Sequence, residues 1–112
     1  MSKHHLGEFE EVVLLTVAVL HDEAYGIAIN DEMEKRLDRK VSIGSLQTVL
    51  RRLEKKGHLS SKLGEATKIR GGKRKRYFYL TSYGRKTLET TKEQRLSLWN
   101  AIPNLELDKG YV

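Results

Sequence analysis

The spacing of apolar residues changes along the chain in a fixed order, and this order most restricts the possible fold. Three successive segments repeat apolar residues at intervals of three and four, as amphipathic helices do. Two short runs then alternate apolar and polar residues, as half-buried strands do, and a long segment with sparse apolar residues follows. The order predicts a mainly α-helical chain with one small β-hairpin, in the α+β class.

The first two helices are predicted from dense apolar runs. The first spans Leu6–His21 and is apolar nearly all round from Val12 to Leu20, so we expect that half to be buried. By period alone this run also fits a buried strand, but its length and its neighbours favour a helix. The second helix spans Ala24–Leu37, and its apolar residues at steps of four include Tyr25, Ile29, Met33 and Leu37.

The third predicted helix, Ile43–Lys56, has clear signals at both ends. Ser42 precedes it as a plausible N-cap, and Gly57 is a natural stop. One apolar face comprises Ile43, Leu46, Val49, Leu50 and Leu53. We expect the apolar stripes of all three helices to form the core.

A hairpin and a last helix complete the predicted elements. The strands are Leu59–Leu63 and Lys75–Leu80, joined by the glycine-rich, charged segment Gly64–Arg74. Thr81 is a plausible N-cap for a helix over Ser82–Ile102, which Pro103 ends.

Three helices followed by a two-stranded wing form a winged helix-turn-helix. We therefore expect a winged helix-turn-helix DNA-binding domain over residues 1–81, a long C-terminal dimerisation helix over 82–103 and a tail over 104–112.

Positive charge is concentrated in one part of the chain. Residues 1–50 contain 5 Lys and Arg against 9 Asp and Glu, residues 51–76 contain 11 against 2, and residues 77–112 contain 5 against 4. The excess therefore lies on the end of the third helix and on the hairpin. In a winged helix these two parts meet DNA, so the distribution predicts binding to double-stranded DNA.

Recognition would use the polar face of the third helix in the major groove, where Gln47 suits adenine and Arg51 or Arg52 suits guanine or phosphate. The hairpin would contact the DNA backbone or the minor groove. The predicted DNA-binding residues are Ser42, Ser45, Gln47, Thr48, Arg51, Arg52, Lys68, Arg70, Lys73, Arg74, Lys75 and Arg76.

The last helix has too many apolar residues on one side for a free surface helix. One face of this helix carries Leu88, Leu96, Trp99 and Ile102. A second copy of the chain is the simplest partner that could cover this face. We therefore predict a homodimer with these residues in its interface. A further hypothesis is that Trp99 forms an aromatic wall for a planar hydrophobic effector that weakens DNA binding.

Several other classes of protein are not expected. The chain has no cysteine, which excludes disulfides and thiolate zinc sites, and we predict neither a metal site nor a cofactor. His21 and His58 are interpreted as ordinary surface or turn residues. No catalytic motif occurs, so we expect no enzyme. No apolar run is long enough to cross a membrane, and we expect a cytoplasmic protein. A winged-helix protein-interaction module and an RNA-binding protein remain alternatives.

Several segments, taken in order, resemble the PadR-type regulators. The N-terminal segment Leu6–Glu11 and the run Ala24–Ile27 resemble the family's opening, and Lys40–Gly57 resembles its recognition helix. Gly71–Thr81 with Gly84 resembles the wing and the start of the last helix. The likeness covers about residues 6–88 and implies a homodimeric transcriptional regulator, usually a repressor, of the short branch with a single C-terminal helix.

The resemblance has one departure at a DNA-facing position. The family often has a tyrosine where this chain has Gln47. The resemblance therefore implies no operator sequence for this chain.

Overall fold

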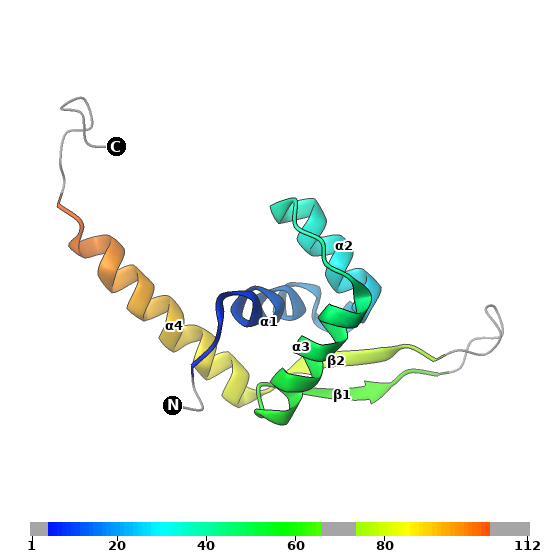
Figure 1. The fold of residues 1–112 in the computed structure, drawn as a ribbon. Coiled ribbons are helices and arrows are strands. Elements are labelled where there is room, and N and C mark those ends of the chain that lie inside the picture. The colour runs from blue at the N-terminus through cyan, green and yellow to red at the C-terminus, as the bar shows by residue number, and fades with distance from the viewer. Residues whose placement is uncertain (1–4, 66–73, 104–112) are drawn as a thin grey trace.

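Four α-helices, one short 3-10 helix and one antiparallel hairpin make up the described part of the fold. The computed structural model describes residues 5–65 and 74–103 (Figure 1). The elements follow the predicted order, and the predicted fold class is confirmed. They are α1 (Glu8–Leu20), η1, a 3-10 helix (His21–Glu23), α2 (Gly26–Leu37), α3 (Ile43–Lys55), β1 (Leu59–Leu63), β2 (Arg76–Leu80) and α4 (Ser82–Ala101).

The core lies where α1, α2 and α3 meet β2. Helix α3 buries one face there because its apolar residues recur with helical period. Phe78 of β2 closes the core from the hairpin side and is 1% exposed. The fully buried apolar side chains include Val13, Leu14, Ile29, Met33, Leu46, Leu50, Leu53 and Phe78.

The ends of α3 and α4 follow the predicted capping signals. The Ser42 Oγ accepts a hydrogen bond from the Ser45 N–H at 3.1 Å, and the Thr81 Oγ1 accepts one from the Gly84 N–H at 2.9 Å. Gly57 has φ +88°, a conformation that glycine adopts readily, and it turns the chain from α3 into β1. These local signals fix where α3 ends and where α4 begins.

The hairpin pairs Ser61 with Phe78 at the middle of its register. The prediction that α2 begins at Ala24 is wrong, because residues 24 and 25 run along the free edge of β2 instead. The Phe78 N–H donates to the Ala24 carbonyl at 2.8 Å, and Tyr25 forms a bridge with Tyr77. The wing is thereby joined to the start of α2.

Part of α1 is not covered, contrary to the sequence-based expectation. Leu15 and Val19 are 45% and 55% exposed, because α2 and α4 flank α1 and leave its outer side open (Figure 1). Leu37 and Ile43 are also exposed, at 53% and 43%, so not every residue of the predicted stripes belongs to the core. Leu15 and Val19 lie one helical turn apart, so they form a continuous uncovered apolar strip on α1.

The prediction for His58 as a surface or turn residue is wrong. The turn at Gly57 brings His58 beneath the start of α4, where it is fully buried and its ring stacks on Tyr83 with centroids 4.8 Å apart. Gly84 packs so tightly there that an added Cβ would lie 2.2 Å from the His58 carbonyl oxygen. The start of α4 is therefore firmly seated on the domain.

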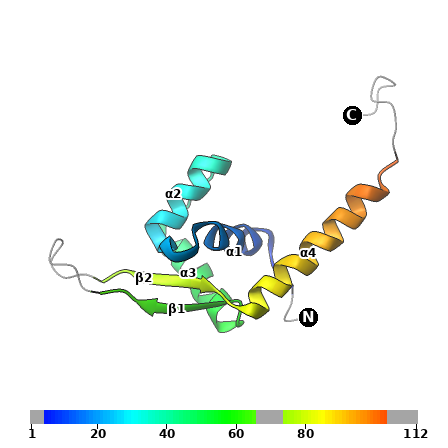
Figure 2. The ribbon, with the colours of Figure 1, turned by 180° about the vertical axis from the view of Figure 1, so that it is seen from behind.

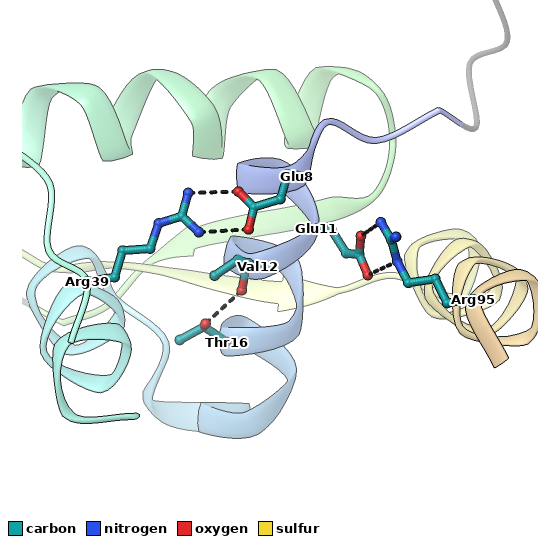
Figure 3. A network of polar contacts seen from close by, with 6 residues as sticks. All are labelled: Glu8, Glu11, Val12, Thr16, Arg39 and Arg95. Carbon is teal, nitrogen blue, oxygen red and sulfur yellow. Dashed lines mark hydrogen bonds and ion pairs between the residues drawn. The ribbon is translucent and has the colours of Figure 1, made fainter. Parts of the chain in front are cut away.

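Ion pairs attach α1 to its surroundings on two sides (Figure 3). The Arg39 guanidinium donates to both carboxylate oxygens of Glu8, each at 2.8 Å. On the other side, Arg95 of α4 donates to Glu11. From its packed start, α4 extends away from the helical core on the side opposite the hairpin, as two opposed views show (Figure 1 and Figure 2).

Candidate nucleic-acid interface

One face of α3 points into solvent along the whole helix. Gly44, Thr48, Arg51 and Lys55 are all exposed and lie opposite the buried apolar face. The side chain of Thr48 donates to the Gly44 carbonyl at 3.0 Å, and Arg51 forms no ion pair with any acidic residue that the structure describes. The face therefore presents a hydroxyl, a free guanidinium and an ammonium on a regular helix.

Gln47 lies at the edge of this face instead of at its centre. Its side chain is half-buried beside the start of α2, and its Nε2 lies 3.0 Å from the position that a Cβ on Gly26 would take. Ser42 and Ser45 are exposed at the N-terminal end of α3, where the Ser42 hydroxyl donates to the Ser45 Oγ at 2.9 Å. Gln47 is therefore turned toward the start of α2 and is less accessible than the residues at the centre of the face.

Glu10 of α1 neutralises part of the positive charge on α3. The Lys56 ammonium donates to both carboxylate oxygens of Glu10, at 3.1 Å and 2.9 Å, and Arg52 Nη1 lies 3.8 Å from Oε2. Arg52, although exposed, is thus partly turned toward α1. Arg51 has no such acidic neighbour among the described residues, so its guanidinium is the more available of the two.

The pKa of Glu10 reports the same contacts. Burial alone would raise the pKa of this carboxyl, but hydrogen bonds from the Gly7 N–H and from Lys56, and the charges of Lys56 and Arg52, hold the pKa below its usual value. Glu10 is therefore a carboxylate at neutral pH and holds the C-terminal end of α3 against α1.

The wing brings three further cationic side chains to the region beside α3. Arg74 donates to the Gly64 carbonyl at 2.8 Å, and the Lys75 ammonium lies 4.1 Å above the Tyr25 ring. The Arg76 Nη1 donates to the Ser61 Oγ at 3.0 Å. Each contact is made by the guanidinium or ammonium end of the side chain, while the residue stays exposed.

Arg76 is also connected to α3 through the strand beside it. The Ser61 hydroxyl donates to Glu54 Oε2 at 2.7 Å, so the series Arg76, Ser61 and Glu54 joins β2, β1 and α3. The predicted wing residues Lys68, Arg70 and Lys73 lie outside the described residues.

Sequence reasoning missed one cation on the exposed face of α3 and one on the outer face of the wing. Lys55 lies on the outer face of α3, and extending the spacing of Thr48 and Arg51 by one turn would have found it. Lys62 of β1 is exposed, with its ammonium 5.5 Å above the Tyr79 ring. No pattern in the sequence singles out Lys62, because its place depends on the pairing of β1 with β2.

A second feature, far from this face, is an apolar hollow between α1 and α4. Its volume is about 450 Å³, and Leu15, Leu88, Leu96 and Trp99 contribute to its walls. Trp99 is 69% exposed, and Ile102, further along α4, is 58% exposed. The predicted interface residues therefore present uncovered apolar surface, of which Leu88 is the most buried member.

Two negative findings concern only the described residues. Among them, no group of three or more His, Asp or Glu side chains could hold a metal ion. No helix there is long and apolar enough to span a membrane.

Comparison with solved structures supports the same fold. A PadR-like transcription factor from Bacteroides fragilis is 28% identical, with a TM-score of 0.68 over 82% of this chain and 84% of that chain. A PadR family transcriptional regulator from Eggerthella lenta DSM 2243 is 25% identical, with a TM-score of 0.66 over 83% and 80%. A transcriptional regulator from Clostridium thermocellum, 23% identical with a TM-score of 0.67 over 92% of both chains, shares the fold.

The family assignment rests on a match over most of the chain. No curated protein matches it significantly. The model of the PadR-like transcriptional regulator family matches residues 14–90, from α1 through the wing to the first half of α4. The chain therefore belongs to the PadR-like family of transcriptional regulators and has the winged-helix DNA-binding fold of that family.

Proposed function

We propose that this protein is a sequence-specific DNA-binding repressor that acts as a homodimer. The observation that carries the proposal is the exposed polar and cationic face of α3 beside a basic wing, in a chain of the PadR-like family. Residues 1–81 form the DNA-binding unit, and residues 82–103 form the dimerisation helix. As a transcriptional regulator it would act in the cytoplasm.

Helix α3 would lie in the major groove. Arg51 reads a base edge or a phosphate at the centre of the face, and Thr48 and Lys55 contact the DNA on either side. The wing residues Arg74 and Lys75 contact the backbone or the minor groove beside it. Thr48, Arg74 and Lys75, which already make contacts within the protein, would then meet the DNA with little loss of side-chain freedom.

The apolar hollow supports the dimer. A face that exposes Leu15 on α1 and Leu96 and Trp99 on α4 is unusual for a small chain that stays monomeric. A two-fold dimer covers both copies of this face with one contact. Its two α3 helices would read half-sites about 34 Å apart or a multiple of that distance.

Selection of bound sequences from random duplex DNA tests this function. We expect a palindromic motif whose affinity falls steeply with salt. Weak duplex binding without any motif would instead support a protein-interaction module, and a preference for single strands or RNA hairpins would support an RNA-binding protein. A reporter gene placed behind the selected motif tests repression, and expression that rises with the regulator would contradict it.

A matched pair of variants tests the DNA-binding face. Arg51→Ala should cost about 1–3 kcal/mol in affinity for the selected motif, because it removes a base or phosphate contact. Lys86→Ala removes one positive charge from an exposed position on α4 and should leave the affinity nearly unchanged. Fluorescence anisotropy with labelled duplexes measures both, and equal affinities for Arg51→Ala and the parent chain would show that the face is wrongly assigned.

The same hollow supports an effector site. A planar hydrophobic compound bound beside Trp99 would quench the fluorescence of the chain's single tryptophan and weaken DNA binding. Titration of a varied panel of such compounds measures the quenching. A panel without any effect on fluorescence would remove the support for an effector.

A further inference from the structure

Helix α4 is anchored at its start, and further along the ion pair between Arg95 and Glu11 is the polar contact that the described residues provide between α4 and the rest of the domain. At the start, the Thr81 hydroxyl donates to the Gly57 carbonyl at 2.6 Å, and Gly84 packs against His58. Leu88 is half-buried, but most of the described residues after it are exposed. A helix fixed at one end only can tilt about that end.

The contact further along is the ion pair between Arg95 and Glu11. Arg95 donates through Nη2 to Glu11 Oε1 at 2.6 Å and through Nε to Oε2 at 3.2 Å, so the two planar groups face each other edge to edge (Figure 3). The Glu11 side chain is only 15% exposed. Among the described residues, this is the ion pair that joins α4 to another helix.

The distance of the ion pair from the anchored start of α4 allows the pair to restrict the direction of the helix. Arg95 lies eleven residues after Gly84, which is about 16 Å along the helix axis. A bidentate guanidinium–carboxylate contact restricts orientation as well as distance. The pair therefore supplies the second fixed point that a direction requires.

We propose that the ion pair between Arg95 and Glu11 fixes the direction of α4 relative to α3, and thereby sets the half-site spacing that the dimer accepts. The inference rests on the proposed DNA-binding dimer. Helix α4 is about 30 Å long, so a change of about 10° in its direction moves its far end by about 5 Å. This exceeds the rise of one base pair, about 3.4 Å, so the tilt alone can shift the accepted spacing.

Two variants break the pair with opposite changes of net charge. Glu11→Gln removes a negative charge, and Arg95→Met removes a positive charge while keeping a long apolar side chain. An effect that both variants show therefore cannot come from the change in net charge. Arg36→Met is the control, because Arg36 pairs with Glu32 of its own helix α2.

The first measurement is the affinity for two half-sites at different spacings. We expect the parent chain to bind its preferred spacing at least tenfold more tightly than a spacing changed by one base pair. In Glu11→Gln and Arg95→Met this preference should fall below threefold, and Arg36→Met should keep it. The exchanged pair Glu11→Arg with Arg95→Glu should restore much of the preference.

The second measurement needs no DNA. The chain has no native cysteine, so Lys35→Cys on α2 and Ser97→Cys on α4 introduce unique sites for spin labels. Labelled chains are diluted with excess unlabelled chain, so that each dimer carries one labelled protomer. We expect a narrow distance distribution for the parent pair and a clearly broader one when Glu11 or Arg95 is replaced.

The outcomes separate this inference from the proposed function. A parent chain that selects no paired half-sites would refute the DNA-binding dimer and the spacing claim together. A parent chain with one preferred spacing, and variants with the same preference or the same distance distribution, would overturn the role of the ion pair alone.

Discussion

Two glycines in helices occupy opposite environments, and this difference is informative at the scale of single residues. Gly44 lies on the exposed face of α3, where an added Cβ would meet no other atom of the described chain within 4 Å. Gly84 lies at the buried start of α4, where an added Cβ would overlap a backbone carbonyl. The protein's own packing requires the second glycine but not the first.

Replacing Gly44 should separate stability from DNA binding. Gly44→Ala should raise the free energy of unfolding by up to about 1 kcal/mol, because alanine favours the helix. The same methyl group would stand between α3 and DNA in the groove, so affinity for the selected motif should fall several-fold. Thermal denaturation and anisotropy titration measure the two effects, and undiminished affinity would argue against close approach of DNA at Gly44.

The same substitution at Gly84 should have the opposite effect on stability. The added Cβ would lie 2.2 Å from the His58 oxygen and 2.9 Å from Leu80 Cδ1, so the start of α4 would have to move. We expect Gly84→Ala to lower the free energy of unfolding by about 1–3 kcal/mol, as overpacking does. Urea denaturation checks this, with Gly44→Ala as the control; unchanged stability would mean that α4 is not tightly seated.

At the scale of elements, Glu10 couples α1 to α3 and makes stability depend on pH. The folded-state pKa of Glu10 lies below its ordinary value of 4.5, so its contribution is fully present above that pH. It is lost as the pH falls through the folded-state pKa. The Arg39 guanidinium, through its hydrogen bonds, likewise holds the pKa of Glu8 down, so Glu8 acts in the same direction.

Glu10→Gln should therefore weaken the acid dependence. We expect a loss of about 1–3 kcal/mol at pH 7, because the Lys56 ammonium loses its buried carboxylate. The fall in stability below pH 4.5 should become shallower without vanishing, since Glu8 still titrates. Urea denaturation between pH 3 and 7 measures both, with Glu34→Gln, which breaks an exposed pair 3.6 Å from Lys40, as the control. A Glu10→Gln chain with the parent's pH profile would contradict this assignment.

At the scale of the whole molecule, the proposed homodimer depends on the exposed apolar face of α4. Trp99→Ala should weaken the dimer by about 2 kcal/mol or more, as truncation of a buried interface tryptophan does. Ser97→Ala is a suitable control, because two positions along a helix place its side chain about 200° away from Trp99. Sedimentation equilibrium measures both dissociation constants, and similar values for the two variants would contradict an interface at Trp99.

Local signals in the sequence were sufficient to predict the helices and strands. The stripe from Leu46 to Leu53 identified α3, the alternation around Phe78 identified β2, and Ser42 and Thr81 marked two helix starts. These signals act within a few residues of one another, so they do not depend on how the chain packs. The outward face of α3 follows directly from the helical period.

Long-range contacts account for what the sequence did not show. Lys56 and Glu10 are 46 positions apart and Arg95 and Glu11 are 84 apart, and no local period relates such residues. The burial of His58 depends on where α4 begins relative to Gly57, and the edge position of Ala24 depends on β2. The exposure of Leu15 depends on how α2 and α4 pack on either side of it.

The sequence by itself determined the succession of helices and strands, their main boundaries and the gathering of positive charge on α3 and the wing, because periodicity, capping and composition are properties of neighbouring residues. Only the tertiary structure decided which cations are paired with carboxylates, which apolar side chains stay uncovered and how α4 is directed. Those features depend on distances between residues far apart in the chain, and packing alone sets such distances.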